Sequence, residues 1–156
     1  LPEMEKRLKE TDKGSGAYFC SLPGFRDTYR LLARIVERNG QSVYLMLCSI
    51  TNGKGQPMKN EERLDMMGKE LQDTLAHCLR RGDSYTRYSK SRYLLLLVGT
   101  NRENCSLIFE RIQKYFSREH KTWSKYLEYA VSSVADSGFN SEDNENKWKW
   151  GKTWDK

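Results

Sequence analysis

Apolar and polar residues follow one another along the chain in patterns that predict three helices and four strands. In three segments apolar residues recur every three or four positions, which is the spacing of one buried helix face. We therefore expect helices at about 25–39, 61–81 and 102–116. Shorter apolar runs, bounded by turn-forming residues, are typical of strands. We expect these at about 41–50, 83–88, 92–98 and 126–135.

The order of these elements indicates a fold class. After the first helix the chain reads strand–helix–strand–strand–helix–strand, which is the split-βαβ arrangement of ferredoxin-like folds. Only Ser89–Ser91 separates the two middle strands, so these must pair as an antiparallel hairpin. Two strands carry nearly continuous apolar runs, at 43–48 and 94–98, which favours burial on both faces. The prediction is an α+β domain: an antiparallel sheet with an extra N-terminal helix, and with helices over one face.

Polar segments divide the chain into three parts. Residues 1–20 read as a linker or as the end of a preceding helical region, with a break at Lys13–Gly16. Residues 21–136 hold all the periodic segments and form the predicted domain. Residues 137–156 form a polar tail that is poor in aliphatic residues but carries three tryptophans, namely Trp148, Trp150 and Trp154.

Composition narrows the function classes. The 156 residues carry 27 Lys and Arg against 21 Asp and Glu, a net charge of +6, and the balanced ends leave this excess on the predicted domain. Such an excess suits an anionic small ligand, an acidic partner or weak nucleic-acid contact without choosing among them. Four cysteines without short spacing and only two histidines predict neither a metal site nor another cofactor. No apolar run is long enough to span a membrane, and we expect a cytoplasmic protein without a membrane partner.

The predicted hairpin resembles a known family. Residues 87–95, RYSKSRYLL, resemble the R-Y-G-G-D/E-E-F signature of GGDEF (diguanylate cyclase) domains and the strand after it. Residues 22–26, LPGFR, resemble the L-P-N-R that opens the family's first helix. Residues 45–51 fall where that family has a metal-binding strand, and 131–135 resemble its last strand. The resemblance covers 22–136 in one order and implies the GGDEF fold.

The departures from the family pattern concern its chemistry. In active members, carboxylates of the signature and of the first strand hold two divalent metals. Here Ser91 and Arg92 stand at the two acidic signature positions, followed by Tyr93, and Ser49 and Thr51 replace the strand aspartates. In addition, Ser89 and Lys90 replace the two glycines of the signature. Hydroxyl groups bind Mg²⁺ poorly and a guanidinium repels it, so we expect a degenerate domain that is not an enzyme.

One family feature is retained in the sequence. Active members often carry an allosteric site for cyclic di-GMP, written R-x-x-D, and Arg80 and Asp83 fit it at the family's spacing from the signature. The resemblance also implies a second arginine on the next helix, which Arg111 supplies. The alternative is that none of the three binds a ligand. Arg80 then only favours a helix C-terminus, Asp83 only starts a strand, and Arg111 is only a solvated charge.

These observations lead to two hypotheses about function. The first is a non-catalytic signalling domain of a bacterial regulator that binds cyclic di-GMP or a related nucleotide. The alternative is a protein–protein interaction or dimerisation scaffold without a nucleotide ligand. Residues 16–30 resemble segments of bacterial transcriptional activators, which implies that any DNA contact lies in an N-terminal domain outside this chain. The expected protein partners are a second copy or other domains of that parent.

Overall fold

The computed structural model describes residues 1–10 and 16–136. Its long elements lie close to the predicted ones. The helices are α1 (Pro2–Leu8), α2 (Leu22–Asn39), α3 (Glu61–Cys78) and α4 (Arg102–Phe116). The strands are β1 (Tyr18–Phe19), β2 (Val43–Ile50), β3 (Ser84–Ser89), β4 (Arg92–Val98) and β5 (Leu127–Ser133). Two 3₁₀ helices flank β5, at Lys121–Tyr126 and Val134–Asp136.

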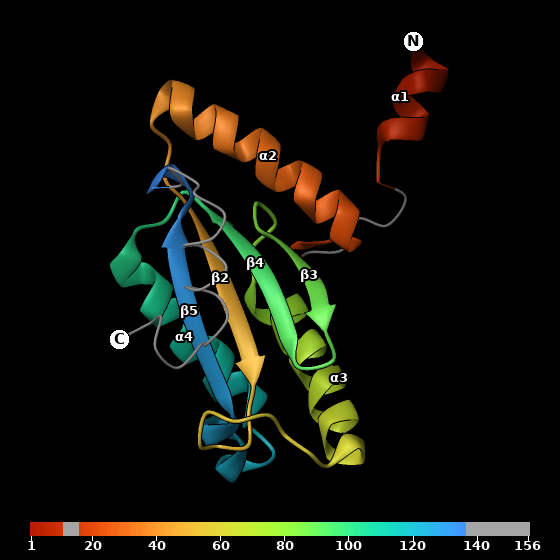
Figure 1. The fold of residues 1–156 in the computed structure, drawn as a ribbon. Coiled ribbons are helices and arrows are strands. Elements are labelled where there is room, and N and C mark those ends of the chain that lie inside the picture. The colour runs from red at the N-terminus through yellow and green to blue at the C-terminus, as the bar shows by residue number, and fades with distance from the viewer. Residues whose placement is uncertain (11–15, 137–156) are drawn as a thin grey trace.

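The five strands form one sheet in the order β1-β3-β4-β2-β5 (Figure 1). All neighbours are antiparallel except β1 and β3, which are parallel. Without β1, the order is that of a split-βαβ sheet, which confirms the predicted fold class. The short β1 was not predicted. It lies within the segment 1–20 that the sequence analysis assigned to a linker, so the sheet begins before the expected boundary.

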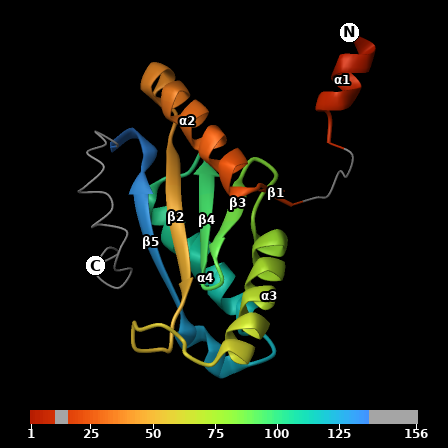
Figure 2. The same cartoon turned by 45° about the vertical axis from the view of Figure 1, so that its right-hand side comes forward.

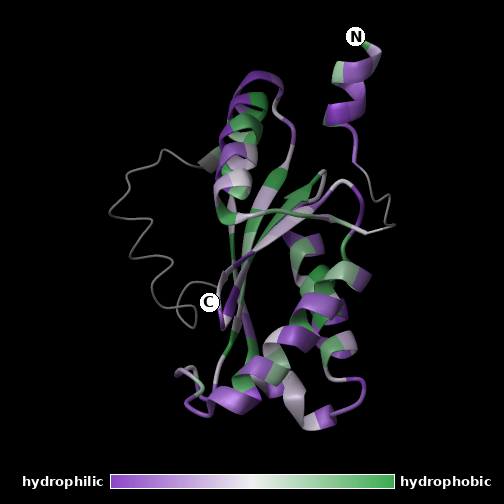
Figure 3. Cartoon of the chain, turned by 90° about the vertical axis from the view of Figure 1, so that its right-hand side faces the viewer, coloured by the Kyte–Doolittle hydropathy of each residue, from purple (hydrophilic) through white to green (hydrophobic). Residues whose placement is uncertain are grey.

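Helices cover both faces of the sheet, which corrects the expectation of helices over one face (Figures 1 and 2). Along β4, Tyr93, Leu95 and Leu97 pack with α3 and α4, whereas Leu94, Leu96 and Val98 pack with α2. Successive side chains of a strand point to opposite faces. A strand that is apolar on both faces therefore needs cover on both sides, and α2 supplies the second layer. Figure 3 shows that the hydrophobic positions concentrate on the strands and on the helix surfaces turned toward them.

The ends of two helices differ from prediction for local reasons. The helix α2 starts at Leu22 rather than near 25, because Ser21 Oγ accepts a hydrogen bond from Gly24 N and Pro23 is tolerated in a first turn. It ends at Gly40, whose φ of 70° is the left-handed conformation expected at this stop. The helix α3 ends at Cys78 instead of 81, since Leu79 is extended with ψ of 153°. The strand boundaries shift by one or two residues.

Two further findings concern regions outside the sheet. The helix α1 has no buried residue and lies apart from the other described elements (Figure 1). None of the helices among residues 1–10 and 16–136 is long and apolar enough to cross a membrane. The predicted tail 137–156, with its three tryptophans, lies outside the described residues.

Candidate functional site

The turn between α3 and β3 contains Arg80 and Asp83, two of the three predicted ligand-binding residues. These two residues are hydrogen-bonded to each other. The Asp83 side chain is buried, with 2% of its surface exposed. Its Oδ2 accepts a hydrogen bond from the backbone N–H of Arg80 at 3.0 Å, and its Oδ1 accepts one from Val98 N at 3.2 Å. The Arg80 guanidinium donates to both oxygens at 3.4 Å. The carboxylate therefore ties the end of α3 to the end of β4.

The Arg80 guanidinium, in contrast, remains accessible. Its side chain is 54% exposed, although one terminal nitrogen donates to the carbonyl of Val98 at 2.9 Å. Asp83 thus fixes the direction of this guanidinium while most of the cation faces solvent. An anion could reach Arg80 without breaking a buried contact, whereas a ligand donor could reach Asp83 only by displacing one of its hydrogen bonds.

The N-terminal segment meets the same turn. The backbone N–H of Tyr18 donates to the Asp83 carbonyl at 3.0 Å. Gly16 lies against α3 so closely that a Cβ atom there would come within 2.4 Å of the Ala76 carbonyl oxygen. The Arg81 guanidinium pairs with Glu10 at 3.5 Å. The turn is therefore in contact with the segment that begins at Gly16 and, through Arg81, with Glu10.

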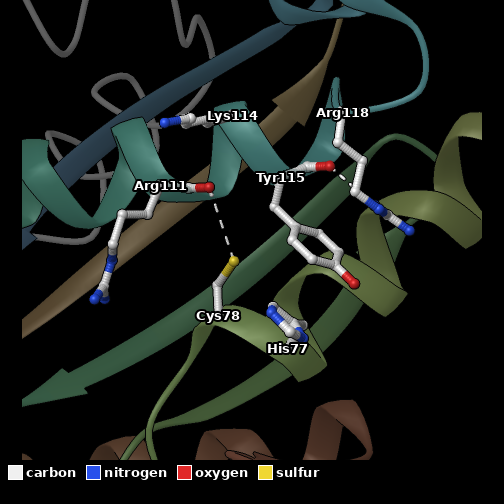
Figure 4. A pocket seen from close by; sticks show the side chains of 6 residues that line it. All are labelled: His77, Cys78, Arg111, Lys114, Tyr115 and Arg118. Atoms are coloured by element: carbon white, nitrogen blue, oxygen red, sulfur yellow. Dashed lines mark hydrogen bonds between the residues drawn. The ribbon is translucent and has the colours of Figure 1, made fainter.

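Arg111, the third predicted residue, lies on α4 beside the end of α3. Its carbonyl oxygen is 3.8 Å from Cys78 Sγ, two residues before Arg80. The two helices enclose an open groove there, with a volume of about 440 Å³ (Figure 4). Six side chains line this groove, which we call the α3–α4 groove: His77, Cys78, Arg111, Lys114, Tyr115 and Arg118.

The wall of the α3–α4 groove is a stack of three planar groups. The rings of His77 and Tyr115 lie 4.1 Å apart and nearly parallel. The Arg118 guanidinium lies 3.9 Å from the Tyr115 ring centroid and pairs with Glu70. Burial raises the pKa of Cys78 above its ordinary value, and the cations Arg111 and Arg118 offset part of this rise. The groove is thus a cationic surface next to a protonated thiol.

Sequence reasoning found only Arg111 among these six residues. Part of their signal is nevertheless present: Arg111 and Lys114 are three positions apart on α4 and so lie on neighbouring parts of its surface, and Arg118 follows two residues after the helix ends. What the sequence did not reveal is that the end of α3 packs beside this part of α4. Residues 77 and 78 come near α4 only through the fold, across the 33 positions that separate Cys78 from Arg111.

The segment that resembles the GGDEF signature occupies the β3–β4 hairpin, as predicted. Lys90 and Ser91 form the turn, Ser89 pairs with Arg92, and the pairing shifts register between Arg87 and Ser89. Among the described residues other than glycine, none has a positive φ. The turn therefore needs no glycine here, which explains how it accommodates Lys90 and Ser91.

The end of β2 lies beside this hairpin, so the structure brings together the positions where the sequence resemblance places metal-binding carboxylates. Ser49 pairs with Arg92, and Ile50 N donates to the Ser91 carbonyl at 2.7 Å. Ser49 and Thr51 are both 8% exposed. The Thr51 hydroxyl accepts from Gly53 N at 3.1 Å and lies 3.4 Å from the Tyr126 carbonyl, to which it donates. These strand ends therefore offer two nearly buried residues with hydroxyls, of which that of Thr51 is used in local hydrogen bonds, together with the Arg92 guanidinium.

Carboxylates are sparse at the end of β2 beside the hairpin. The strand β5 places Glu128 in register with Ser49, on the side of β2 opposite Arg92. Within 1–10 and 16–136, no three His, Cys, Asp or Glu side chains are grouped so that they could hold a metal ion. A single carboxylate near a guanidinium is a poor site for a divalent cation.

Arg87 and Tyr93 fill the space between the hairpin and α3. The Arg87 guanidinium donates to the carbonyls of Ser89 and Lys90 at 3.2 and 3.1 Å. A Cβ atom at Gly68 would come within 2.8 Å of this guanidinium. The buried Tyr93 hydroxyl donates a hydrogen bond to Gln72 Oε1 at 3.0 Å and lies 3.3 Å from the Gly68 carbonyl. The sequence analysis did not single out Gly68 or Gln72.

Comparison with known proteins identifies this fold. The chain is similar to a diguanylate cyclase protein from Thermotoga maritima, with 20% identity and a TM-score of 0.51 over 78% of this chain and 83% of that one. It is also similar to the coiled coil and GGDEF domain of DgcB from Caulobacter crescentus in complex with c-di-GMP, with 13% identity and a TM-score of 0.59. That match covers 85% of this chain and 73% of the other.

A third similar structure is the diguanylate cyclase SiaD from Pseudomonas aeruginosa in complex with its activator SiaC. The identity is 17% and the TM-score 0.61, over 96% of this chain and 60% of that one. No family model and no curated protein sequence matches the chain. These likenesses show the fold, so the chain has the GGDEF-like fold that its hairpin sequence predicted.

Proposed function

We propose that this chain is a non-catalytic regulatory domain with a GGDEF-like fold, which binds cyclic di-GMP at the Arg80–Asp83 turn. The observation that carries the proposal is the composition of the edge formed by β2 and the hairpin. Ser49, Thr51, Ser91 and Arg92 occupy the positions where the sequence resemblance places metal-binding carboxylates.

Electrostatics explains why this composition disfavours catalysis. Two divalent metals that activate a ribose hydroxyl and neutralise a triphosphate need several anionic oxygen ligands. The edge instead presents Arg92, and the hydroxyls of Ser49 and Thr51 are almost completely buried. The guanidinium would repel the metals, and the Thr51 hydroxyl cannot turn toward them without losing its hydrogen bonds to Gly53 and Tyr126.

The ligand hypothesis rests on the two accessible arginines. Arg80 is held by Asp83 and half exposed, and Arg111 is exposed on α4 near the end of α3. A guanidinium can pair with a phosphate or with the Hoogsteen edge of guanine. In this arrangement Asp83 is a positioning residue for Arg80, because its own oxygens accept hydrogen bonds inside the protein. The c-di-GMP in the DgcB structure is consistent with such a role for this fold.

The second candidate function is a protein-interaction scaffold without a nucleotide. The internal use of Asp83 favours it, since a carboxylate bound in this way explains the R-x-x-D pattern without any ligand. Apolar side chains exposed outside the groove, such as Tyr18, Leu31 and Leu107, also favour it. For either function we propose a place in a longer bacterial transcriptional regulator, where the domain acts on a second copy or on neighbouring domains.

Calorimetric titration of the chain with cyclic di-GMP separates the two functions. We expect saturable binding that is weakened at least about fivefold in Arg80→Ala and in Arg111→Ala, because each loses one charge-assisted contact. Arg34→Ala is the matched control, since Arg34 is exposed on α2, and its affinity should equal that of the wild type. No saturable binding by the wild type would refute the ligand hypothesis and leave the scaffold. Equal binding by all variants would place the ligand elsewhere.

A further inference from the structure

The α3–α4 groove contains two cations that have no ion-pair partner among residues 1–10 and 16–136. Arg118, at one end, pairs with Glu70 of α3. Arg111 and Lys114 form no ion pair with any described residue, and both are exposed. In Figure 4 both side chains extend away from Arg118, in different directions from each other. Two cations one helical turn apart repel each other unless an anion lies between or beside them.

The lining of the groove defines the chemistry of a ligand. None of the six lining side chains is a carboxylate, and Arg111 and Lys114 offer only hydrogen-bond donors. The exposed imidazole of His77 adds a further polar group to the groove, and its ring is stacked on Tyr115. Several donors and two positive charges without an ion-pair partner among the described residues suit a multiply charged anion with many acceptor oxygens.

We propose that the α3–α4 groove is a binding site for phosphate groups of a small molecule, held by Arg111 and Lys114 beside the His77–Tyr115 stack. The proposal extends the proposed function, with which it shares Arg111, by placing phosphate-binding residues beyond the Arg80–Asp83 turn. It does not require that the ligand be cyclic di-GMP. The volume of about 440 Å³ is large enough for a nucleotide-sized molecule.

The stack explains why the groove is suited to binding. The Tyr115 ring is held between His77 on one side and the Arg118 guanidinium on the other. Because Arg118 is also fixed by Glu70, the wall keeps its shape without a ligand. A preformed wall lowers the conformational entropy that binding has to overcome. Glu70 thereby neutralises Arg118, the cation that supports the wall, and leaves Arg111 and Lys114 available for a ligand.

The test is a titration of the chain with inorganic pyrophosphate, followed by ¹H–¹⁵N NMR. We expect saturable shifts confined to 76–80 and 110–118, and binding that weakens with added salt. Lys114→Gln should reduce the affinity at least about fivefold, because one of two phosphate contacts is lost. Lys59→Gln is the matched control, since Lys59 is exposed, precedes α3 and lies at its opposite end, and its affinity should not change.

Several outcomes would overturn the proposal. Shifts that do not saturate, or that spread over the surface, would show nonspecific attraction to a cationic protein. Equal weakening by Lys59→Gln and Lys114→Gln would show the same. Binding of a polyglutamate peptide but not of pyrophosphate would make the groove a peptide site. The proposed function can fail separately. If the chain binds pyrophosphate in the groove but does not bind cyclic di-GMP, the phosphate site is supported and only the assignment of cyclic di-GMP as the ligand is refuted.

Discussion

Replacing Asp83 by alanine tests whether this carboxylate is structural or reserved for a ligand. The substitution removes the acceptor of two backbone N–H groups, those of Arg80 and Val98. An unsatisfied buried donor costs about 1–3 kcal/mol. The half-exposed Arg80 guanidinium can turn to water, so its loss of a partner adds little. We therefore expect the free energy of unfolding to fall by about 3–5 kcal/mol, which is a large part of the stability of a small domain.

Urea denaturation followed by circular dichroism measures this change. Arg80→Ala is the control on the same ion pair, and we expect it to lower the free energy of unfolding by about 1 kcal/mol or less, because only an exposed cation is removed. Asp83→Asn should fall between the two, since one side-chain oxygen remains as an acceptor. An Asp83→Ala variant as stable as the wild type, but unable to bind cyclic di-GMP, would refute the reasoning and make Asp83 a ligand contact.

Two further predictions concern stability. Gly16→Ala should lower the free energy of unfolding by about 1–3 kcal/mol in urea denaturation, because its Cβ would meet the Ala76 carbonyl at 2.4 Å. Gly82→Ala, with nothing within 4 Å, should be nearly neutral, and equal effects would contradict the tight contact. Burial raises the pKa of Cys48 to about 12 and that of Cys105 to about 11, from 9.0. These thiols should therefore not affect the free energy of unfolding below pH 9. Between pH 9 and pH 12 the free energy of unfolding should fall, because the thiols ionise in the unfolded chain before they ionise in the folded one. If replacing both by serine leaves this alkaline decline unchanged, other groups cause it.

The sequence predicted the sheet well because its strongest signals are local. The runs in β2 and β4 are apolar at almost every position, and the short gap between β3 and β4 permits only a hairpin. The same runs also implied cover on both faces, but nothing in the sequence said that α2 would provide it. The two-residue β1 carries no periodic signal, and its pairing with Ser84 and Tyr85 depends on contacts 66 positions away along the chain.

The candidate site was only partly predictable, since its chemistry depends on tertiary contacts. The R-x-x-D spacing correctly brought Arg80 and Asp83 together. It did not reveal that the Asp83 oxygens accept from Val98, which follows 15 residues later. The sequence analysis singled out Arg111 on the predicted helix but not Lys114, which follows it three positions later. Only the packing of α3 against α4 shows that a groove lies beside them.

The most direct test of the central claim, that a GGDEF-like fold here serves regulation without catalysis, is incubation of the chain with GTP and Mg²⁺ and analysis of the nucleotides by mass spectrometry. An active diguanylate cyclase treated in parallel shows that the assay detects product. The account predicts that no cyclic di-GMP forms above the background without protein. Formation of cyclic di-GMP by the wild type, abolished by Glu128→Gln, would contradict it and show that the edge of β2 holds catalytic metals after all.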